Sequence, residues 1–215
     1  MLHWSQHMSE DTLKRYTDVP ALIYLLKHRA ITLLDPGSWD DTNDSHCMSE
    51  YKTKHSLKTV LALCFTQTSE TYHHWRVFAG SSSGVCITFN RDELLRVIGS
   101  TPGIKCKPVD YLTLDKLRKN NTAVARLPFI KRHGFQDESE FRIIYESKEE
   151  SFLTKDIEIP LSSIEKITLS PWIPKALTTS MKETIQSIKG CKKIKIVRST
   201  LISNAEWKKL TRNAA

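Results

Sequence analysis

The run Val60–Phe65 limits the possible folds more than any other part of the chain. It reads Val-Leu-Ala-Leu-Cys-Phe and contains no charged or strongly polar side chain. Such a run has the length of a strand, and a strand that is apolar on both sides must be covered on both faces. We therefore expect Val60–Phe65 to be a central strand with other elements packed above and below it.

Shorter strands and several helices are predicted around this central strand. The helix starts are marked by Asp18 with Pro20 and by Asn90, and Gly99 and Gly190 mark helix ends. The expected strands are Leu13–Tyr16, Ile31–Leu34, Val85–Phe89, an extended stretch Gly103–Tyr111, Phe141–Tyr145, Ile157–Ile159, Ile164–Leu169 and Ile194–Val197. The expected helices are Val19 to about Arg29, Arg91–Ile98, Thr113–Ala125 and Lys175–Lys189, with Ser69 capping a short segment that ends at Phe78.

Strands outnumber helices in the middle of the chain, and this order favours one fold class. We expect a single α+β domain with a mixed or mainly antiparallel sheet and flanking helices, rather than a doubly wound fold. The predicted boundaries are an N-terminal segment at 1–12, the domain at 13–200 and a basic C-terminal tail at 201–215.

The composition indicates a basic protein of the cytoplasm. Of the 215 residues, 32 are Lys or Arg and 24 are Asp or Glu, so the net charge is +8. This excess favours acidic partners such as nucleotides or nucleic acid. The five cysteines are widely spaced and form no C-x-x-C pair, so we expect reduced thiols. No apolar run is long enough for a membrane helix, and no signal peptide is recognisable, so no membrane partner is expected.

The segment Glu138-Ser139-Glu140-Phe141-Arg142 is the strongest candidate for an active site. The two-residue period of a strand places Glu138, Glu140 and Arg142 on one face. Crowded carboxylates have separated pKa values, so one of them can act as a base or orient a hydroxyl while Arg142 holds an anion. The alternative is an exposed strand face that carries a structural salt bridge.

Three other segments carry polar or aromatic side chains that could form a site. The acidic loop Trp39–Asp44 could bind a metal or a ribose, although turn formation explains its composition equally well and we expect no metal. The stretch Tyr72–Arg76 could stack on a base or a nicotinamide ring, with Trp75 also interpreted as a core anchor. The serines Ser81–Ser83 could donate backbone N–H groups to a phosphate, but a plain turn is favoured.

Several common enzyme classes lack their signatures in this chain. The sequence contains no G-x-S-x-G elbow, no H-E-x-x-H pair, no G-x-G-x-x-G fingerprint and no phosphate-binding G-x-x-x-x-G-K-[ST] loop. Hydrolases of the elbow type, zinc proteases, Rossmann enzymes and nucleoside-triphosphate enzymes are therefore not favoured.

The order of these segments resembles a large uncharacterised family of bacterial and phage proteins, catalogued only as a domain of unknown function. The similarity is carried, within a stretch of roughly residues 13 to 170, by Lys14-Arg15-Tyr16, Leu33–Asp44, Cys64–Thr66, Trp75, Gly84–Phe89, Tyr111 and Glu138–Ile144. Members of that family show a Lys-Tyr start, an Asn-Asp-Pro loop and a Glu-x-Glu-Trp-Arg strand. In this chain Ser45 stands where the proline is usual, and the resemblance implies no established activity.

The layout is also similar to that of ADP-ribosyltransferases, in which a late strand opens with Glu-x-Glu. In that group the late glutamate contacts the nicotinamide ribose of NAD and stabilises the oxocarbenium-like transition state. The resemblance implies that Glu140 has this role and that Glu138 orients the acceptor. It also implies that Arg15 holds the pyrophosphate and that Tyr16 or Trp75 stacks on nicotinamide.

Three functions follow as alternatives from these observations. The first is an NAD-using transferase with a protein or nucleic-acid acceptor, acting as a toxin or antiphage effector. The second is a nucleic-acid-binding module without catalysis, suggested by the basic residues from Lys189 to Arg198. The third is a metal-dependent nuclease, which requires the carboxylates of Asp40–Asp44 to meet Glu138 and Glu140 in space.

Overall fold

The predicted central strand is present as β3 (Thr59–Thr66) in a computed structural model that describes residues 11–119 and 121–212. Seven of its eight residues are buried, and Cys64 is half-buried. Along one edge it pairs antiparallel with β8 (Glu140–Ser147) over its whole length. Leu61, Leu63 and Phe65 face the main hydrophobic cluster, whereas Val60 and Ala62 belong to a second cluster. Burial on both faces is thereby confirmed.

The sheet around β3 is mainly antiparallel and has nine strands. Its order is β11-β10-β4-β1-β3-β2-β9, with β8 joining β3 to β5, and only β10 and β11 pair in parallel. The strands not yet given are β1 (Thr12–Asp18), β2 (Ala30–Leu34), β4 (Gly84–Asn90), β5 (Ile104–Pro108), β9 (Thr154–Glu158), β10 (Ile164–Leu169) and β11 (Lys195–Arg198). A separate two-stranded parallel sheet contains β6 (Asp110–Leu112) and β7 (Ile130–Arg132). The predicted α+β class is confirmed.

The second edge of β3 is shared by two strands that each contact it only briefly. β1 pairs with β3 at Lys14 and Thr66, and β2 pairs with it at Leu34 and Ala62. Between these two points the sheet opens, and the Nη1 atom of Arg15 donates a hydrogen bond of 3.1 Å to the Cys64 carbonyl in the opening. The candidate site lies at this gap, where β1 and β2 are not hydrogen-bonded to β3.

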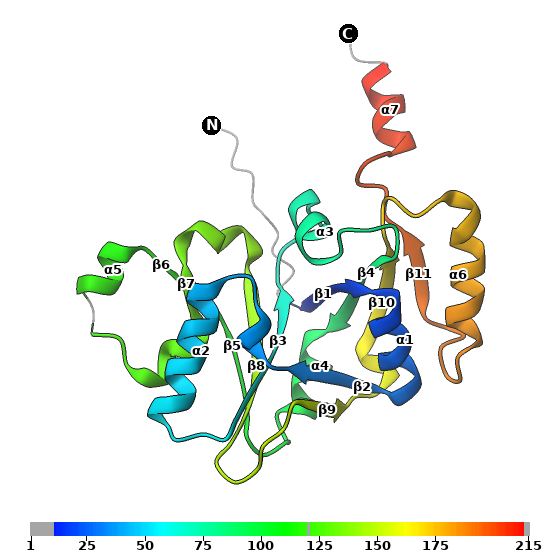
Figure 1. Cartoon of the computed structure of the whole chain (residues 1–215). Helices are drawn as coiled ribbons and strands as arrows, with labels where there is room; N and C mark the ends of the chain where they lie inside the picture. The colour runs from blue at the N-terminus through cyan, green and yellow to red at the C-terminus, as the bar shows by residue number, and fades with distance from the viewer. Residues whose placement is uncertain (1–10, 120, 213–215) are drawn as a thin grey trace.

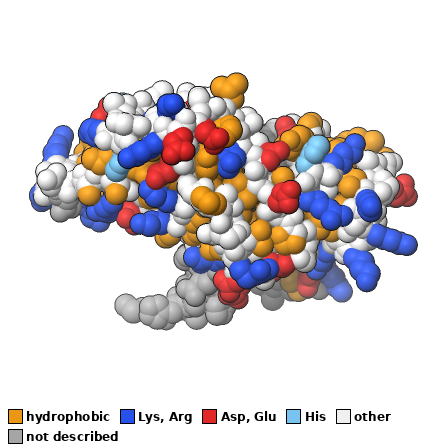
Figure 2. Space-filling model, turned by 90° about the horizontal axis from the view of Figure 1, so that it is seen from below, with side chains coloured by type: hydrophobic (Ala, Val, Ile, Leu, Met, Phe, Trp, Pro, Cys, Tyr) orange, Lys and Arg blue, Asp and Glu red, His pale blue; other side chains and the backbone are white. Residues whose placement is uncertain are grey.

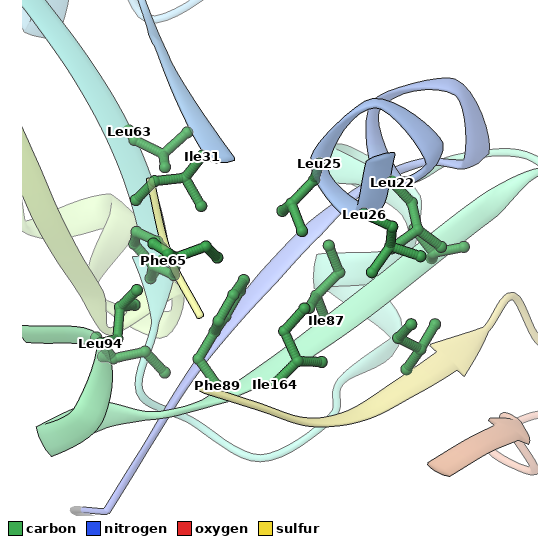
Figure 3. Packing of buried hydrophobic residues seen from close by; sticks show 14 of the residues in the cluster. Leu22, Leu25, Leu26, Ile31, Leu63, Phe65, Ile87, Phe89, Leu94 and Ile164 are labelled. Atoms are coloured by element: carbon green, nitrogen blue, oxygen red, sulfur yellow. The ribbon is translucent and has the colours of Figure 1, made fainter. Parts of the chain in front are cut away.

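Helices α1 (Val19–His28) and α4 (Arg91–Ile98) begin and end near the predicted residues. The Asp18 carboxylate caps α1, and the Asn90 side chain caps α4 by accepting from the Glu93 amide. Figure 3 shows Leu22, Leu25 and Leu26 of α1 facing Ile87 and Phe89 of β4 in the main cluster. Helix α6 (Lys175–Ser187) lies on the same side of the molecule as α1 (Figure 1).

Three predicted segments differ from the structure. The predicted loop at Trp39–Asp44 contains the start of helix α2 (Thr42–Lys54), which Asp41 caps; Asp44, Met48 and Tyr51 are its buried residues. Because the charged Asp44 is one of the buried residues, the apolar residues of this helix do not recur at helical spacing in the sequence. Helix α3 (Tyr72–Phe78) is capped by Thr71 rather than Ser69, and α5 (Leu114–Lys119) ends well before Ala125.

Short 3₁₀ helices and an exposed C-terminal helix accompany these main elements. Short 3₁₀ helices lie at Pro36–Ser38 (η1), Val124–Phe129 (η2), His133–Glu138 (η3) and Leu161–Ser163 (η4). Helix α7 (Ala205–Arg212) extends from the body and has no buried residue (Figure 1). Figure 2 shows Lys and Arg side chains at both ends of the face seen from below, with Asp and Glu side chains between them.

The described part of the chain also bears on the predictions for thiols and membrane helices. All five cysteines are free thiols, as predicted. None of the described helices has both the length and the apolar character that a membrane crossing requires. Most of the predicted N-terminal segment, residues 1–12, lies outside the described residues.

Candidate active site

A cavity of about 730 Å³ occupies the opening beside β3. This volume is within the range of roughly 300–1,000 Å³ that is common for small-molecule sites. Its wall is built from segments far apart in the sequence. They are Lys14–Asp18 of β1, Leu34 of β2, Ser38–Asp41 and Asp44, Ala62–Thr66 of β3, His74, Val77 and Phe78 of α3, Ala79–Ser81, Ser83 and Gly84 of the following turn, and Lys131, Phe135, Glu138 and Glu140. The cavity therefore joins most of the residues that the sequence predicted for a site.

Glu138, Glu140 and Arg142 form one charged cluster, as the sequence predicted. The Arg142 Nε atom donates to Glu140 Oε1 at 2.7 Å. Glu140 and Glu138 are 4% and 7% exposed, so the alternative of an exposed strand face is wrong. Glu138 is not part of the strand; it ends η3, and Ser139 turns the chain with a φ of 44° before β8 begins at Glu140.

Lys131 connects the carboxylates of this cluster, and no sequence motif pointed to it. Its Nζ atom lies 2.6 Å from Glu138 Oε2, 3.4 Å from Glu140 Oε2 and 3.7 Å from Asp44 Oδ2. The ammonium also lies 4.9 Å from the centre of the Phe135 ring. Lys131 is thus the cation of the cluster that lies on the cavity wall.

Arg142 lies behind the wall and is held from several sides. It forms a two-point ion pair with Asp44, with N–O distances of 2.9 and 2.7 Å, and its Nη1 atom also donates to the Pro128 carbonyl. The Trp39 ring centre lies 4.8 Å from the guanidinium carbon. Arg142 is 0% exposed and is not among the wall residues, so the structure does not place it where it would hold an anionic ligand.

The two glutamates have pKa values that move in opposite directions. Burial alone raises the pKa of both carboxyl groups, since it disfavours the charged form. For Glu140, the charges of Arg142 and Lys131 outweigh burial, and its pKa is lowered. For Glu138, burial outweighs the contact with Lys131, and its pKa is raised. The predicted separation of the two pKa values is therefore present, with Glu140 as the more stable anion.

The backbone carbonyl of Glu138 is held by two neighbouring side chains. Thr66 Oγ1 donates to it at 2.6 Å, and the His74 Nε2 atom lies 3.2 Å from the same oxygen. His74 is itself held through its Nδ1 atom, 2.6 Å from Thr71 Oγ1, and burial lowers the pKa of this histidine. These contacts fix the position of η3 beside the cavity.

Arg15 and Tyr16 of β1 both reach the cavity, although Tyr16 is mostly buried. The Tyr16 ring packs against His74 and, edge-on, against Trp75, with centroid distances of 5.3 and 5.1 Å. Burial, followed by the neighbouring Cys86, raises the pKa of the Tyr16 hydroxyl. Both residues line the cavity, although the Tyr16 hydroxyl itself is buried.

Trp75 is a core residue rather than a wall residue. It is 0% exposed, and its Nε1 atom donates to Glu70 Oε1 at 2.6 Å. The interpretation of Trp75 as a core anchor is confirmed. On the same helix, Val77 and Phe78 are 56% and 42% exposed and line the cavity. Phe78, Trp39 and Phe135 are thus accessible aromatic side chains on the wall that the sequence did not single out as ligand contacts.

Of the acidic residues in the segment Trp39–Asp44, Asp44 is the one that shares ion-pair partners with Glu138 and Glu140. Lys131 and Arg142 pair with Asp44 as well as with the glutamates, so cations stand between these carboxylates. Asp41 uses Oδ1 to cap α2. Within residues 11–119 and 121–212, no group of three or more His, Cys, Asp or Glu side chains is arranged to hold a metal ion. The arrangement does not favour the nuclease alternative.

Comparison with known proteins finds similarity in overall arrangement only. No family model matches the chain and no curated protein matches it, so the resemblance to the uncharacterised family is not confirmed. A solved structure of Thermus sp. 2.9 DarT in complex with NAD+ superposes with a TM-score of 0.47 at 7% identity, covering 88% of this chain and 95% of that one. DarT from the same source in complex with ADP-ribosylated ssDNA gives a TM-score of 0.48 at 7% identity, with 89% and 95% covered.

Proposed function

We propose that the protein is an NAD-consuming enzyme of the ADP-ribosyltransferase type. The observation that carries the proposal is the single cavity whose wall combines Arg15 and Tyr16 of β1 with Glu138 and Glu140 before and within β8. A cavity of ligand size with convergent polar groups and carboxylates of shifted pKa is the usual form of an enzyme site.

The charges on the cavity wall suit NAD, which carries a pyrophosphate and a cationic nicotinamide ring. Lys14 and Arg15 on β1 supply positive charge for the phosphates. Glu138 and Glu140 supply negative charge on another part of the wall, where a cationic ring or a developing oxocarbenium ion would be stabilised.

The different pKa values of the two glutamates suggest different tasks. When the bond between nicotinamide and the ribose carbon breaks, its electron pair goes to the ring nitrogen and nicotinamide leaves as a neutral molecule. Glu140, held as an anion, stabilises the positive charge left on the ribose. An acceptor oxygen or nitrogen then bonds to that carbon and loses a proton, which Glu138 accepts because its raised pKa suits proton exchange.

The acceptor in this proposal is a protein or a nucleic acid, and the basic composition favours the nucleic acid. An enzyme that depletes the NAD pool, or that inactivates an essential macromolecule by modifying it, harms the cell that contains it. The proposal therefore includes a role as a toxin or antiphage effector.

Nicotinamide release from NAD tests the proposed activity. Glu140→Gln keeps the size of the side chain and a hydrogen-bond acceptor for Arg142 but removes the charge, so we expect release to fall by about 10²-fold or more. Glu146→Gln is the matched control, because Glu146 lies on the same strand and pairs with Lys105 at 2.6 Å away from the cavity. No release by the folded wild type with protein or nucleic-acid acceptors, or equal loss in both variants, would contradict the proposal.

A further inference from the structure

The turn Glu138-Ser139-Glu140 carries both carboxylates on a backbone conformation that its residues do not favour by themselves. Ser139 has a φ of 44° and a ψ of 52°, in the left-handed region of backbone space. A residue with a Cβ atom adopts this region at an energetic cost, and such a conformation persists only where the surrounding structure fixes it. The turn therefore depends on partners outside itself.

Neighbouring backbone groups hold the middle of the Glu138–Glu140 turn. The Ser139 amide donates to the Gln136 carbonyl at 3.1 Å, and the Ser139 carbonyl accepts from the Gln67 amide at 2.9 Å. The Glu140 carbonyl accepts from the Val109 amide at 2.9 Å. Gln67 directly follows β3 and Val109 directly follows β5, so segments distant in the sequence flank the turn.

Side chains from three other elements hold the two ends of the turn. At its start, the Glu138 carbonyl accepts from Thr66 of β3 and from His74 of α3. At its end, the Glu140 amide donates to the hydroxyl oxygen of Tyr111 on β6 at 2.8 Å. Thr66 and His74 are buried, so a carbonyl that lost either donor would have little access to water in its place.

The partners of His74 define where its proton lies. A carbonyl oxygen can only accept, so the Nε2 atom carries the proton that points to Glu138. The Nδ1 atom is then free to accept from the Thr71 hydroxyl, and the lowered pKa of His74 favours this neutral ring. His74 is consequently a fixed donor to the turn.

We propose that Thr66, His74 and Tyr111 are positioning residues that hold the Glu138–Glu140 turn in its reactive geometry. The inference rests on the proposed function. Misplacing a reacting group by about 1 Å can cost about 10²-fold in rate, so two carboxylates with different tasks need a fixed backbone between them. The three side chains act through the turn and therefore affect kcat rather than the binding of NAD.

Thr66→Val tests the proposal by removing one hydroxyl at nearly constant shape. Thr59→Val is the matched control at the other end of β3. At both positions the hydroxyl donates to a backbone carbonyl at 2.6 Å, that of Glu138 or of Glu150, and accepts one backbone N–H. Both threonines are buried, so the two variants lose the same kinds of contact.

Kinetics of nicotinamide release give the first readout. In Thr66→Val we expect kcat to fall by about 10-fold or more while KM for NAD changes by less than about twofold. Thr59→Val should retain the wild-type kcat. Thr66→Ser keeps the hydroxyl and should restore most of the lost rate.

Tyr111→Phe tests the other end of the turn in the same way. It removes the acceptor of the Glu140 amide, so kcat should again fall with little change in KM. Tyr51→Phe is its control, because the Tyr51 hydroxyl contacts Glu146 on the same strand as Glu140 but outside the cavity wall. This control should leave kcat unchanged.

Amide hydrogen exchange gives a second readout that needs no activity. The Glu140 amide is hydrogen-bonded within the held turn, so loosening the turn should speed its exchange. We expect an increase of about 10-fold in Thr66→Val relative to Thr59→Val.

The two readouts separate the positioning role from the proposed activity. If the wild type releases nicotinamide but Thr66→Val keeps its kcat, or loses no more than Thr59→Val, the positioning role is wrong and the activity stands. If the wild type releases none, the activity fails; faster exchange of Glu140 in Thr66→Val alone would then still support the held turn. Equal exchange in both variants would overturn it in either case.

Discussion

Glu138 and Glu140 lie two residues apart, yet their surroundings shift their pKa values in opposite directions. Glu140 is contacted by Arg142 and Lys131, whereas Glu138 has Lys131 as its close cation. Both carboxylates are largely removed from water, so each charge depends on its partners rather than on solvent. Both glutamates contact Lys131, and its positive charge lowers the pKa of each of them.

Lys131→Met should move the pH dependence of nicotinamide release. Removing the ammonium takes away the charge that opposes the burial of Glu138, so the pKa of this carboxyl should rise further. If ionised Glu138 is needed, activity is present above that pKa and lost below it. The acid limb of kcat/KM should thus shift to higher pH, by about one pH unit or more.

Two further variants complete this experiment. Lys131→Arg retains the charge and should restore most of the wild-type profile. Lys105→Met removes a similar ion pair, with Glu146, outside the cavity and should leave the profile in place. An unchanged acid limb in Lys131→Met, measured on folded protein, would show that Lys131 has only a structural role.

At the scale of elements, local sequence signals predicted the helices whose ends are capped by side chains and whose buried residues are all apolar. Helix α4 is such a case, with Asn90 at its start and Leu94 and Ile98 buried. Helix α2 was missed because its buried stripe includes Asp44, a residue type that normally indicates a solvent-exposed position. Asp44 is buried only because Arg142, which is distant in sequence, lies opposite it.

Asn90→Ala should lower the free energy of unfolding by about 1 kcal/mol, because the Glu93 amide loses its acceptor. Urea denaturation followed by circular dichroism measures this change. Asn204→Ala is the matched control: Asn204 accepts from the Trp207 amide at the start of α7, a helix without buried residues. Loss of that cap should leave global unfolding nearly unchanged, and equal effects in the two variants would contradict the assignment of α4 to the core.

At the scale of the whole molecule, one cluster of exposed lysines lies outside the cavity wall. The lysines at 189, 192, 193 and 195 are all exposed, and they lie between α6 and β11 or at the start of β11. Clustered exposed lysines attract phosphate backbones without needing a defined sequence. In the proposed function, this surface would contact a nucleic-acid acceptor.

Binding of a single-stranded oligonucleotide should weaken steeply as salt rises. The double variant Lys192→Gln and Lys193→Gln should reduce the slope of log K against log salt by about 1.4, since each phosphate contact on a single strand contributes about 0.7. The variant Lys52→Gln and Lys54→Gln changes the net charge equally but alters α2 instead. A slope that falls equally in both variants would exclude a defined contact at the α6–β11 surface.

The amino-acid sequence by itself determined the central strand, the α+β class, most strand positions, and the pairing of Glu140 with Arg142, because these depend on contacts between residues near one another in the chain. Only the tertiary structure decided that Lys131 and Asp44 complete the charged cluster, that Arg142 and Trp75 are buried, and that Phe78 and Trp39 reach the cavity. The charged cluster depends on the pairing of β8 with β3 and on the packing of α2 beside β7. Both bring together segments that are distant in the chain, which no local pattern of residues records.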